Sequence, residues 1–531
     1  MLGLPKADAL REAAAVLHQR TAATVEAAYG TTLADGRSGL ISHTFRVATA
    51  CCTHCGERSR LYPHALVSML TRRERGGTAA VLACPSGHLF KGDLADASRC
   101  PTCECPVDPR VSYTRRRVVA CSCGHEERLE QRAREGDWSW EVVLVERTAI
   151  GSRELALPTK GERDAAEDPR HKPSLALGAI PEGQETRVLL RHGFTLWSDL
   201  YPRRQRALLE QLLDQSEHCS GEAEVVAAVR MAIVGSAEMA GLLSRWDRYY
   251  LKSFESMAGH RFNFTTLAVE PNVWGTVTSG RGTTVRRLAQ LVRAAEWMER
   301  QAHRPLAVLG PLASDGSPPV DGSEHDVVVV EGSSERMLLA SGAADLVLTD
   351  PPYHDDVQYS ELSLPLRAWA GLSSQTLVGE AVVNGATGQL ADDAAYGNLL
   401  VRIFRESARV LKVDGHLVFS YANRSPSAWI EVLRALNEAN LRAVGCEIVH
   451  SENETDQAKR GVRACSLDLL LDLVPLGDQP VIQHQPKHLI QGAEADFLRI
   501  VARWFLRVGN LSAGWPDQVQ TELRSSEFLS Y

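Results

Sequence analysis

The 531-residue sequence lacks any run of about 18 apolar residues, and its first eight residues lack the charged and apolar regions of a secretory signal. These absences exclude a membrane span and export, so we expect a cytoplasmic protein without membrane contact. An excess of basic charge is also lacking, because 58 Lys and Arg face 66 Asp and Glu, a net charge of -8. Dedicated nucleic-acid-binding domains are usually basic. Any contact with nucleic acid must therefore come from local patches.

Three arginine clusters could form such patches, although a solvated surface is the simpler interpretation of each cluster. The three clusters are Arg115–Arg117, then Arg203 and Arg204 with Arg206, and finally Arg281 with Arg286 and Arg287. The sequence also lacks internal repeats and low-complexity tracts.

Cysteine, in contrast, is concentrated, because nine of the twelve cysteines precede residue 124. In a reducing compartment such clusters favour metal ligation over disulfides. Four tight turns each present two ligands, which suits tetrahedral zinc. We predict one or two closed, structural zinc sites. The eight candidate ligands are Cys52, Cys55, Cys84, His88, Cys100, Cys103, Cys121 and Cys123.

The spacing leaves the pairing of these turns open. It favours 100/103 with 121/123, which matches a common ribbon spacing, and 52/55 with 84/88 as a looser second site. An interleaved pairing of 52/55 with 100/103 is also allowed. Cys51 and Cys105 are neighbours that could replace a ligand.

The rest of the chain divides by composition and periodicity into an α/β protein with several domains. Buried-strand runs at 327–330, 345–349, 415–421 and 467–473 alternate with helical patterns at 396–411 and 429–436, which predicts a mostly parallel sheet. The predicted segments are a helical start (1–45), the zinc-ribbon region (46–130), a linker (131–184), a mostly helical domain that could recognise DNA (185–320), a catalytic α/β region (321–475) and a helical end (476–531).

The most informative stretch is Asp350-Pro351-Pro352-Tyr353, at the end of an apolar strand. Open α/β sheets bind ligands at the carboxyl ends of their strands. The two prolines stiffen the turn and remove two backbone donors, which leaves carbonyls free to accept. The Asp350 carboxylate and the Pro351 carbonyl can each accept a hydrogen bond from an exocyclic NH2 group, and Tyr353 can stack on a base. In duplex DNA that base must first leave the stack.

This tetrapeptide resembles motif IV of the amino methyltransferases that use S-adenosylmethionine. Its context, residues 353–369, resembles the large zinc-ribbon adenine-specific DNA methylases found near restriction and phage-defence genes, as do 196–205, 243–246 and 404–420. The resemblance covers most of 46–475. It implies a Rossmann-like methyltransferase sheet that acts on DNA, most directly at adenine N6, with Asp350 and Tyr353 handling the base. It also implies that Glu331-Gly332-Ser333 lines the adenine side of the cofactor.

Motif I of that family, a glycine-rich turn after an apolar strand, is missing from the sequence. Glycine permits the close backbone approach to the cofactor that this turn makes. The nearest glycine cluster, at 275–282, lacks the preceding strand and acid. We therefore expect a partner protein to supply the motif and an incomplete sheet in this chain. The alternatives are a degenerate, non-catalytic zinc-ribbon scaffold that binds DNA, an unrecognised motif I, cytosine N4 as the target, or an RNA amino-methyltransferase.

Overall fold

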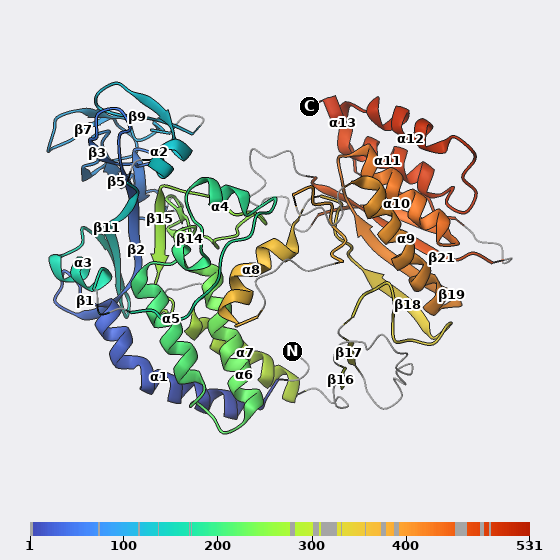
Figure 1. The fold of residues 1–531 in the computed structure, drawn as a ribbon, viewed down its shortest axis with the longest axis horizontal. Coiled ribbons are helices and arrows are strands. Elements are labelled where there is room, and N and C mark those ends of the chain that lie inside the picture. The colour runs from blue at the N-terminus through green and yellow to red at the C-terminus, as the bar shows by residue number, and fades with distance from the viewer. Residues whose placement is uncertain are drawn as a thin grey trace. The chain divides into compact units, whose positions relative to one another are not determined.

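The computed structural model divides the chain into two compact units (Figure 1), and each is described separately. Unit 1 comprises Met1–Ala302 and Glu361–Thr376, and unit 2 comprises His303–Ser360 and Leu377–Tyr531. Residues 361–376 therefore interrupt the catalytic region predicted at 321–475. The structure describes residues 4–72, 75–114, 117–135, 137–168, 170, 172–276, 282–300, 307–309, 327–330, 332–355, 357–372, 379–386, 392–451, 465–477, 483–487 and 490–530.

Unit 1 is built on a six-stranded antiparallel sheet around one long strand, β2. β1, β3, β11 and β15 all pair with β2, and β12 pairs with β11. Ten consecutive residues of β2, 41–50, are buried. Burial of successive residues means that both faces of this strand are covered, since side chains alternate between faces. The strands are β1 (Gly30–Thr32), β2 (Ser38–Cys51), β3 (Arg58–Arg60), β11 (Ser139–Ala149), β12 (Ser152–Ala156) and β15 (Leu267–Pro271).

The linker predicted at 131–184 is wrong for most of its length. The segment holds part of α2 (Leu129–Glu135), the strands β11 and β12, and the helix α3 (Lys160–Ala166). Its many charges suggested a solvated linker, but several are buried in ion pairs. The guanidinium of Arg147, for example, bonds the Glu162 carboxylate at 2.7 Å, and both side chains are less than 10% exposed.

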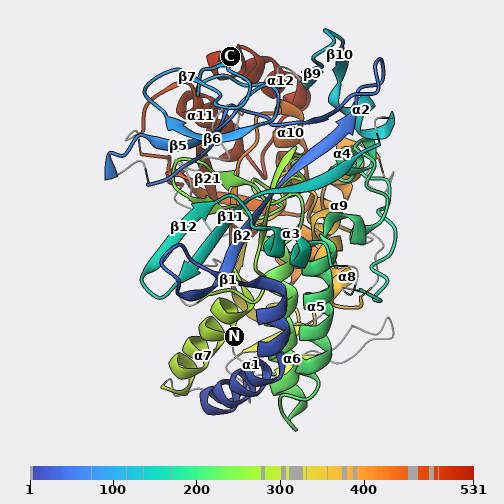
Figure 2. The same ribbon diagram turned by 90° about the vertical axis from the view of Figure 1, so that its left-hand side faces the viewer.

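The helices α1, α5, α6 and α7 gather at one end of this sheet, as Figure 2 shows. α1 contacts α5, α6 and α7. Helices form at the start of the chain and in 185–320, as expected, but they make up only about half of the described residues of that second region. The strands β13 (Trp246–Asp247), β14 (Lys252–Ser253) and β15 interrupt that second region. The helices are α1 (Ala7–Tyr29), α4 (Arg187–Arg191), η2 (Trp197–Leu200), α5 (Arg203–Ser216), α6 (Ala223–Ser236), η3 (Ala237–Met239) and α7 (Thr284–Glu299).

The helix α8 (Tyr359–Trp369), which follows the Asp350 turn in sequence, packs mainly into unit 1. The buried carboxylate of Glu361 accepts hydrogen bonds from the backbone N–H groups of residues 184, 185 and 186, at 2.8, 2.8 and 3.0 Å. The ring of Trp369 lies edge-on to Tyr201, with 5.3 Å between centroids. These contacts explain why residues 361–376 belong to unit 1.

Unit 2 contains a four-stranded sheet in the order β18-β19-β21-β20. β18 and β19 are parallel, whereas β21 runs antiparallel to both of its neighbours. A separate parallel pair is formed by β16 (Ala307–Leu309) and β17 (Val328–Val330). The expected α/β class is confirmed, but the expectation of a mostly parallel sheet is wrong for β20 and β21. The strands of the sheet are β18 (Ala344–Thr349), β19 (Leu411–Tyr421), β20 (Leu441–His450) and β21 (Leu467–Pro475).

The helices of unit 2 lie along one face of this sheet (Figure 1). α9 contacts β19, α11 contacts β20 and β21, and α10 contacts both helices as well as β20. Leu417, Phe419 and Tyr421 of β19 belong to the shared core. No helix of the described residues is long and apolar enough to cross a membrane. The helices are α9 (Asp393–Val410), α10 (Pro426–Glu438), α11 (Ala493–Phe505), α12 (Trp515–Arg524) and α13 (Glu527–Ser530).

Candidate functional site

The predicted tetrapeptide begins directly after β18, as the sequence indicated. Asp350 follows Thr349, the last residue of the strand, and its side chain is exposed. The neighbouring parallel strand β19 ends at Tyr421, so Ser420 reaches the same edge of the sheet. The turn therefore lies where open α/β sheets bind ligands.

One oxygen of the Asp350 carboxylate is fixed by two hydroxyl donors. Tyr353 and Ser420 each donate a hydrogen bond to Asp350 Oδ1, both at 2.7 Å, and their hydroxyl oxygens lie 3.1 Å apart. The other oxygen, Oδ2, accepts no hydrogen bond from the residues that the structure describes. An exposed acceptor is thus held in a defined orientation.

The two proline carbonyls of the turn differ in their partners. The Pro352 carbonyl accepts from the Tyr396 hydroxyl at 3.1 Å and from the His354 backbone N–H at 3.1 Å. The Pro351 carbonyl receives no hydrogen bond within the described part of the chain. Asp350 Oδ2 and the Pro351 carbonyl are therefore two neighbouring acceptors, and the sequence had singled out this same pair.

The ring of Tyr353 is half-buried and packs against the core of unit 2. Its centroid lies 5.2 Å from that of the buried Tyr421. Burial raises the pKa of Tyr353 and the Asp350 carboxylate raises it further, against a smaller opposing effect of Ser420. The phenol therefore stays protonated and remains a donor to Asp350.

His354 fixes the far side of the turn and was missed by sequence reasoning. Its backbone adopts φ 61°, which is uncommon outside glycine. Its ring lies 2.9 Å from Asp393 (Nε2 to Oδ1) and 3.3 Å from Asp355 (Nδ1 to Oδ1). Burial lowers the pKa of His354, but these two carboxylates outweigh it and raise the pKa overall. Ser420, Tyr396 and Asp393 were also missed, because they lie 39 or more residues from their partners in the turn.

The structure describes only two of the three residues of the predicted cofactor segment. Glu331 lies outside the described residues. Gly332 and Ser333 are exposed, and the Ser333 hydroxyl bonds the Glu335 carboxylate at 3.2 Å. No contact joins Gly332 or Ser333 to the Asp350 turn within the described chain.

The eight predicted metal ligands form two groups of four. In each group the ligand atoms all lie within 4.8 Å of one another. The first group is Cys52, Cys55, Cys121 and Cys123, and the second is Cys84, His88, Cys100 and Cys103. The favoured pairing of 100/103 with 121/123 is therefore wrong, as is the interleaved alternative. The correct arrangement is nested, with the outer turns together and the inner turns together.

The distances within the groups suit a tetrahedral zinc ion. Bonds of about 2.3 Å to sulfur imply sulfur–sulfur edges of about 3.8 Å. The structure has 3.9 Å for Cys52–Cys123, 3.7 Å for Cys55–Cys121 and 3.7 Å for Cys84–Cys103. His88 Nδ1 lies 3.5 Å from the Cys84 sulfur. The spare thiol of Cys105 is 3.3 Å from the Cys103 sulfur, so it borders the second group.

All four ligand turns lie between paired strands and share one backbone device. In each turn, an N–H three or four residues later donates to the carbonyl of the first cysteine, and that donor residue has a positive φ. The donors are Gly56, Gly87, Glu104 and Gly124. The turns follow β2, β5 (Ala79–Ala83), β7 (Ser98–Arg99) and β9 (Val118–Ala120), and they precede β3, β6 (Leu89–Asp93), β8 (Pro106–Val107) and β10 (Glu126–Arg128). β4 (Leu66–Met69) completes the small sheet with β5 and β6.

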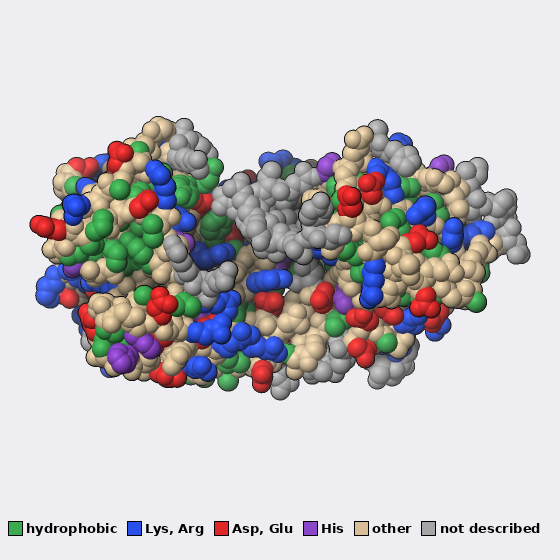
Figure 3. All heavy atoms as spheres, turned by 90° about the horizontal axis from the view of Figure 1, so that it is seen from above, with side chains coloured by type: hydrophobic (Ala, Val, Ile, Leu, Met, Phe, Trp, Pro, Cys, Tyr) green, Lys and Arg blue, Asp and Glu red, His purple; other side chains and the backbone are tan. Residues whose placement is uncertain are grey.

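The arginine clusters do not form one basic face in the described chain. Arg204 is fully buried and bonds Glu270 at 2.8 Å, so it cannot contact a phosphate in this fold. Arg287 pairs with Glu238 at 2.6 Å, and Arg206 donates to the Leu175 carbonyl at 2.6 Å. Figure 3 shows Lys and Arg side chains mixed with acidic ones across the face seen from above. Arg115, Arg116 and Arg281 lie outside the described residues.

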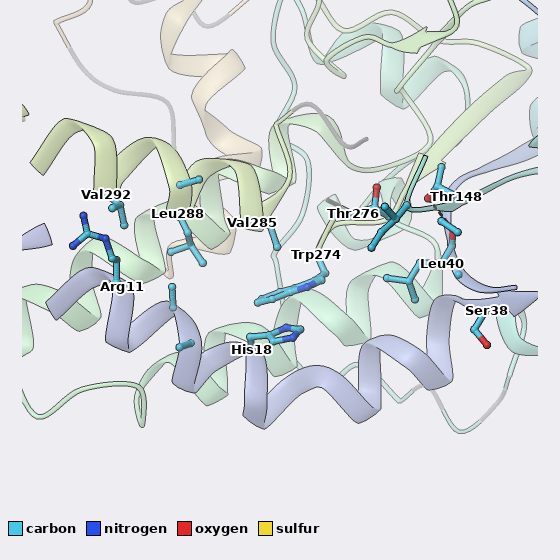
Figure 4. A pocket seen from close by; sticks show the side chains of 17 residues that line it. Arg11, His18, Ser38, Leu40, Thr148, Trp274, Thr276, Val285, Leu288 and Val292 are labelled. Carbon is cyan, nitrogen blue, oxygen red and sulfur yellow. Dashed lines mark hydrogen bonds between the residues drawn. The ribbon is translucent and has the colours of Figure 1, made fainter. Parts of the chain in front are cut away.

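Unit 1 has a cavity of about 720 Å³ between α1, α7 and one end of the sheet (Figure 4). His18 stacks on Trp274 there, with 5.4 Å between ring centroids. Leu40, Leu288 and Val292 contribute apolar surface. None of the predicted catalytic, cofactor or metal residues lines this cavity.

Comparisons with known proteins add little to this geometry. No family model matches the chain. No curated protein matches it either. Among solved structures, a protein of Thermus thermophilus, provisionally named a DNA modification methylase, shares 14% identity over 38% of this chain and 75% of its own, with a TM-score of 0.18. Its complex with S-adenosyl-L-methionine gives 16% identity, 31% and 69% coverage, and a TM-score of 0.17. Scores this low carry no argument about the fold.

Proposed function

We propose that this chain carries the base-handling half of an S-adenosylmethionine-dependent DNA methyltransferase that acts on an exocyclic amine. The proposal is carried by one observation: in the turn that ends at Tyr353, neither Asp350 Oδ2 nor the Pro351 carbonyl accepts a hydrogen bond within the described chain. Adenine N6 is the proposed target, and a restriction-modification or defence setting follows the family resemblance. The chain acts in this proposal as one subunit of the enzyme.

An amino group attached to a base ring is a poor nucleophile because its lone pair is conjugated with the ring. Two acceptors that bond its two N–H groups draw the nitrogen toward a tetrahedral shape and free that lone pair. Asp350 bears the charge that stabilises the developing ammonium group, an electrostatic effect of the kind that dominates many enzymes. Ser420 and Tyr353 position the carboxylate for this task. The exposed carboxylate also gives the released proton a route to solvent.

The turn that would hold the methionine part of the cofactor is missing from this sequence. S-adenosylmethionine would bring an electrophilic methyl group, but its methionine part needs a glycine-rich turn that this sequence lacks. Glu331, Gly332 and Ser333 are proposed to border its adenine. A partner protein is proposed to supply the missing turn, so the methyl donor and the base acceptors would come from two chains.

The two ligand groups are proposed to bind one zinc ion each. Three or four thiolates per site, with no open position, are typical of structural zinc. Such sites couple metal binding to folding, so the metal would hold the β3–β10 region together.

The test is transfer of a labelled methyl group from S-adenosylmethionine to DNA by the chain with its partner. Asp350→Asn removes the charge while keeping the shape, and we expect a loss of at least about 100-fold. Asp345→Asn is the matched control. Asp345 lies on the same strand, and its exposed ion pair with Lys412 at 2.5 Å is worth little. Activity of Asp350→Asn equal to that of the control would refute the assignment.

A further inference from the structure

The strand that delivers Asp350 lies at the edge of its sheet and exposes large apolar side chains. β18 pairs with β19 on one side, and no strand of the described chain pairs with its other side. Leu346 is 53% exposed and Leu348 is 70% exposed. Natural edge strands usually carry charges, prolines or bulges that discourage pairing. β18 has such features only at its start, where Asp345 and a register shift lie, so the two exposed leucines beyond them indicate a surface that another chain covers.

The two leucines point away from the helices of unit 2. Side chains alternate along a strand, and Val347 packs against the core that α9 and α10 share with the sheet. Leu346 and Leu348 face the opposite side, next to His416 and Val418 of β19. The imidazole of His416 bonds Asp472 of β21 at 2.7 Å. The face of the sheet that carries the two leucines is therefore polar at this position on β19 and β21. The exposed apolar surface is therefore largest on the edge strand, and Leu470 of β21, 37% exposed, adds to it farther along the same face.

A second observation comes from β16 and β17. They pair in parallel over three residues and join no larger sheet in the described chain. Val329 and Val330 are 49% and 38% exposed. Parallel strands normally occur in sheets that are covered on both faces. A three-residue pair is too small to be stable alone, and this pair, like β18, exposes apolar side chains.

We propose that the open edge of β18 binds a strand of a partner polypeptide, parallel to β18 and followed by a glycine-rich turn and a helix. This proposal rests on the proposed function, because it identifies the partner by the glycine-rich turn that this sequence lacks. A parallel strand ends at the same edge as β18, so its turn would lie next to Asp350. An antiparallel strand would place the turn at the opposite end of β18, away from Asp350.

The handedness of crossovers predicts where the partner helix lies. The connection from β18 through α9 to β19 places α9 on one face of the sheet. A partner strand beside β18 whose helix leads to a further strand on the side away from β18 forms a connection that runs across the sheet in the opposite direction to the connection from β18 to β19. Right-handed connections then place its helix on the other face, over Leu346 and Leu348. The exposed leucines are on the face that this rule requires.

The binding test uses the full chain and the host polypeptides whose sequences contain an apolar strand, a glycine-rich turn and a helix. We expect one of them to form a one-to-one complex by sedimentation. Leu348→Asp should weaken that complex about 10- to 100-fold, because a buried leucine contact is lost and a charge is placed against it. Leu476→Asp is the matched control, since Leu476 is 50% exposed in the same unit but follows β21, and it should bind like wild type. Absence of any such complex, or equal effects of both variants, would overturn the proposal.

Hydrogen exchange of residues 344–349 tests strand pairing itself. We expect faster exchange in the chain alone and clear slowing in the complex. If Leu348→Asp still binds the partner normally and its exchange still slows in the complex, the role of the leucine face is overturned. If the exchange of residues 344–349 is the same in the wild-type complex as in the chain alone, strand addition is overturned. Self-association of the chain alone that Leu348→Asp abolishes would identify a second copy as the occupant and also overturn the proposal.

The same complex separates this proposal from the proposed function. Asp350→Asn should bind the partner as wild type does, since its side chain lies beyond the strand. A complex that forms through β18 but transfers no methyl group to DNA would support the docking surface and refute the function. Methyl transfer by the chain alone would support the function and overturn the docking surface.

Discussion

The Tyr353 hydroxyl donates a 2.7 Å hydrogen bond to Asp350 Oδ1, three residues earlier in the same turn. This bond and the Ser420 bond occupy Oδ1, and they leave Oδ2 without a hydrogen bond in the described chain. Removing it in Tyr353→Phe should leave the ring and the Ser420 bond in place. We expect methyl transfer to fall about tenfold, which corresponds to about 1.4 kcal/mol, a typical value for a bond to a charged group. Single-turnover kinetics measure this effect.

Tyr353→Ala separates the ring from the hydroxyl. It should also weaken binding of DNA with a displaced base, because stacking on an aromatic ring contributes about 1–3 kcal/mol per base. A fluorescent base analogue in the DNA reports this affinity. If Tyr353→Phe and Tyr353→Ala bind DNA equally, the ring does not contact the base.

The nested metal sites predict a specific pattern of zinc loss. The wild-type chain should bind two zinc ions per molecule, by elemental analysis. Cys55→Ser combined with Cys123→Ser should remove one ion, because both residues belong to the first group. Cys103→Ser combined with Cys123→Ser should remove both ions.

The pairing suggested by spacing alone gives the opposite result for the second double variant. If Cys103 and Cys123 shared a site, their joint replacement would leave one ion bound. Cys219→Ser is a suitable control, since this buried thiol belongs to neither group. It should retain two ions.

A buried ion cluster stabilises unit 1. Glu270 bonds Arg46 at 2.7 Å and Arg204 at 2.8 Å, and all three side chains are at most 3% exposed. Glu270→Gln leaves the buried Arg204 without an anion and leaves Arg46 with only the partly exposed Glu167, so the free energy of unfolding should fall by about 3–5 kcal/mol. Denaturant unfolding measures the change.

An exposed pair provides the comparison for Glu270. Glu296 pairs with Arg11 on the surface, and both side chains are about a third or more exposed. Glu296→Gln should change the unfolding free energy by less than about 1 kcal/mol. Equal losses for the two variants would contradict the importance of burial.

The pH dependence of unit 2 should show the His354 contacts. The pKa of His354 is raised above 6.5 because Asp355 and Asp393 outweigh its burial. A raised pKa contributes stability that is fully present below pH 6.5 and is lost as pH rises through the folded-state value. The stability difference between wild type and His354→Asn should therefore shrink above pH 6.5. Asparagine tolerates the positive φ at this position, and a difference that grows with pH would contradict the assignment.

Local features of the site could be predicted from the sequence, whereas contacts between distant residues could not. The apolar run before Asp350 and the proline pair are local, so β18 and the turn were predicted correctly. Ser420 and Tyr396 reach that turn only through the sheet register and the packing of α9, which no short pattern encodes. The same reason explains the metal ligands, since each turn is local but the nested pairing depends on the fold.

Charge misled the sequence reading where ions are buried. Arg204 stands in an arginine-rich stretch, yet it pairs with a glutamate 66 residues away. Arg147 and Glu162 made 131–184 resemble a linker, although they stabilise each other inside unit 1. An incomplete sheet was expected from the missing glycine-rich motif, but its open edge at β18 was not predicted, because an apolar strand has the same sequence whether or not a neighbour covers it.

The most direct test of the central claim is mass spectrometry of nucleosides from DNA incubated with the chain, its partner and S-adenosylmethionine that carries a deuterated methyl group. We predict labelled N6-methyladenine with wild type and none with Asp350→Asn, while the Asp345→Asn control retains the product. Label on a ring carbon, or equal product from Asp350→Asn, would contradict the claim that Asp350 and the Pro351 carbonyl hold an exocyclic DNA amine.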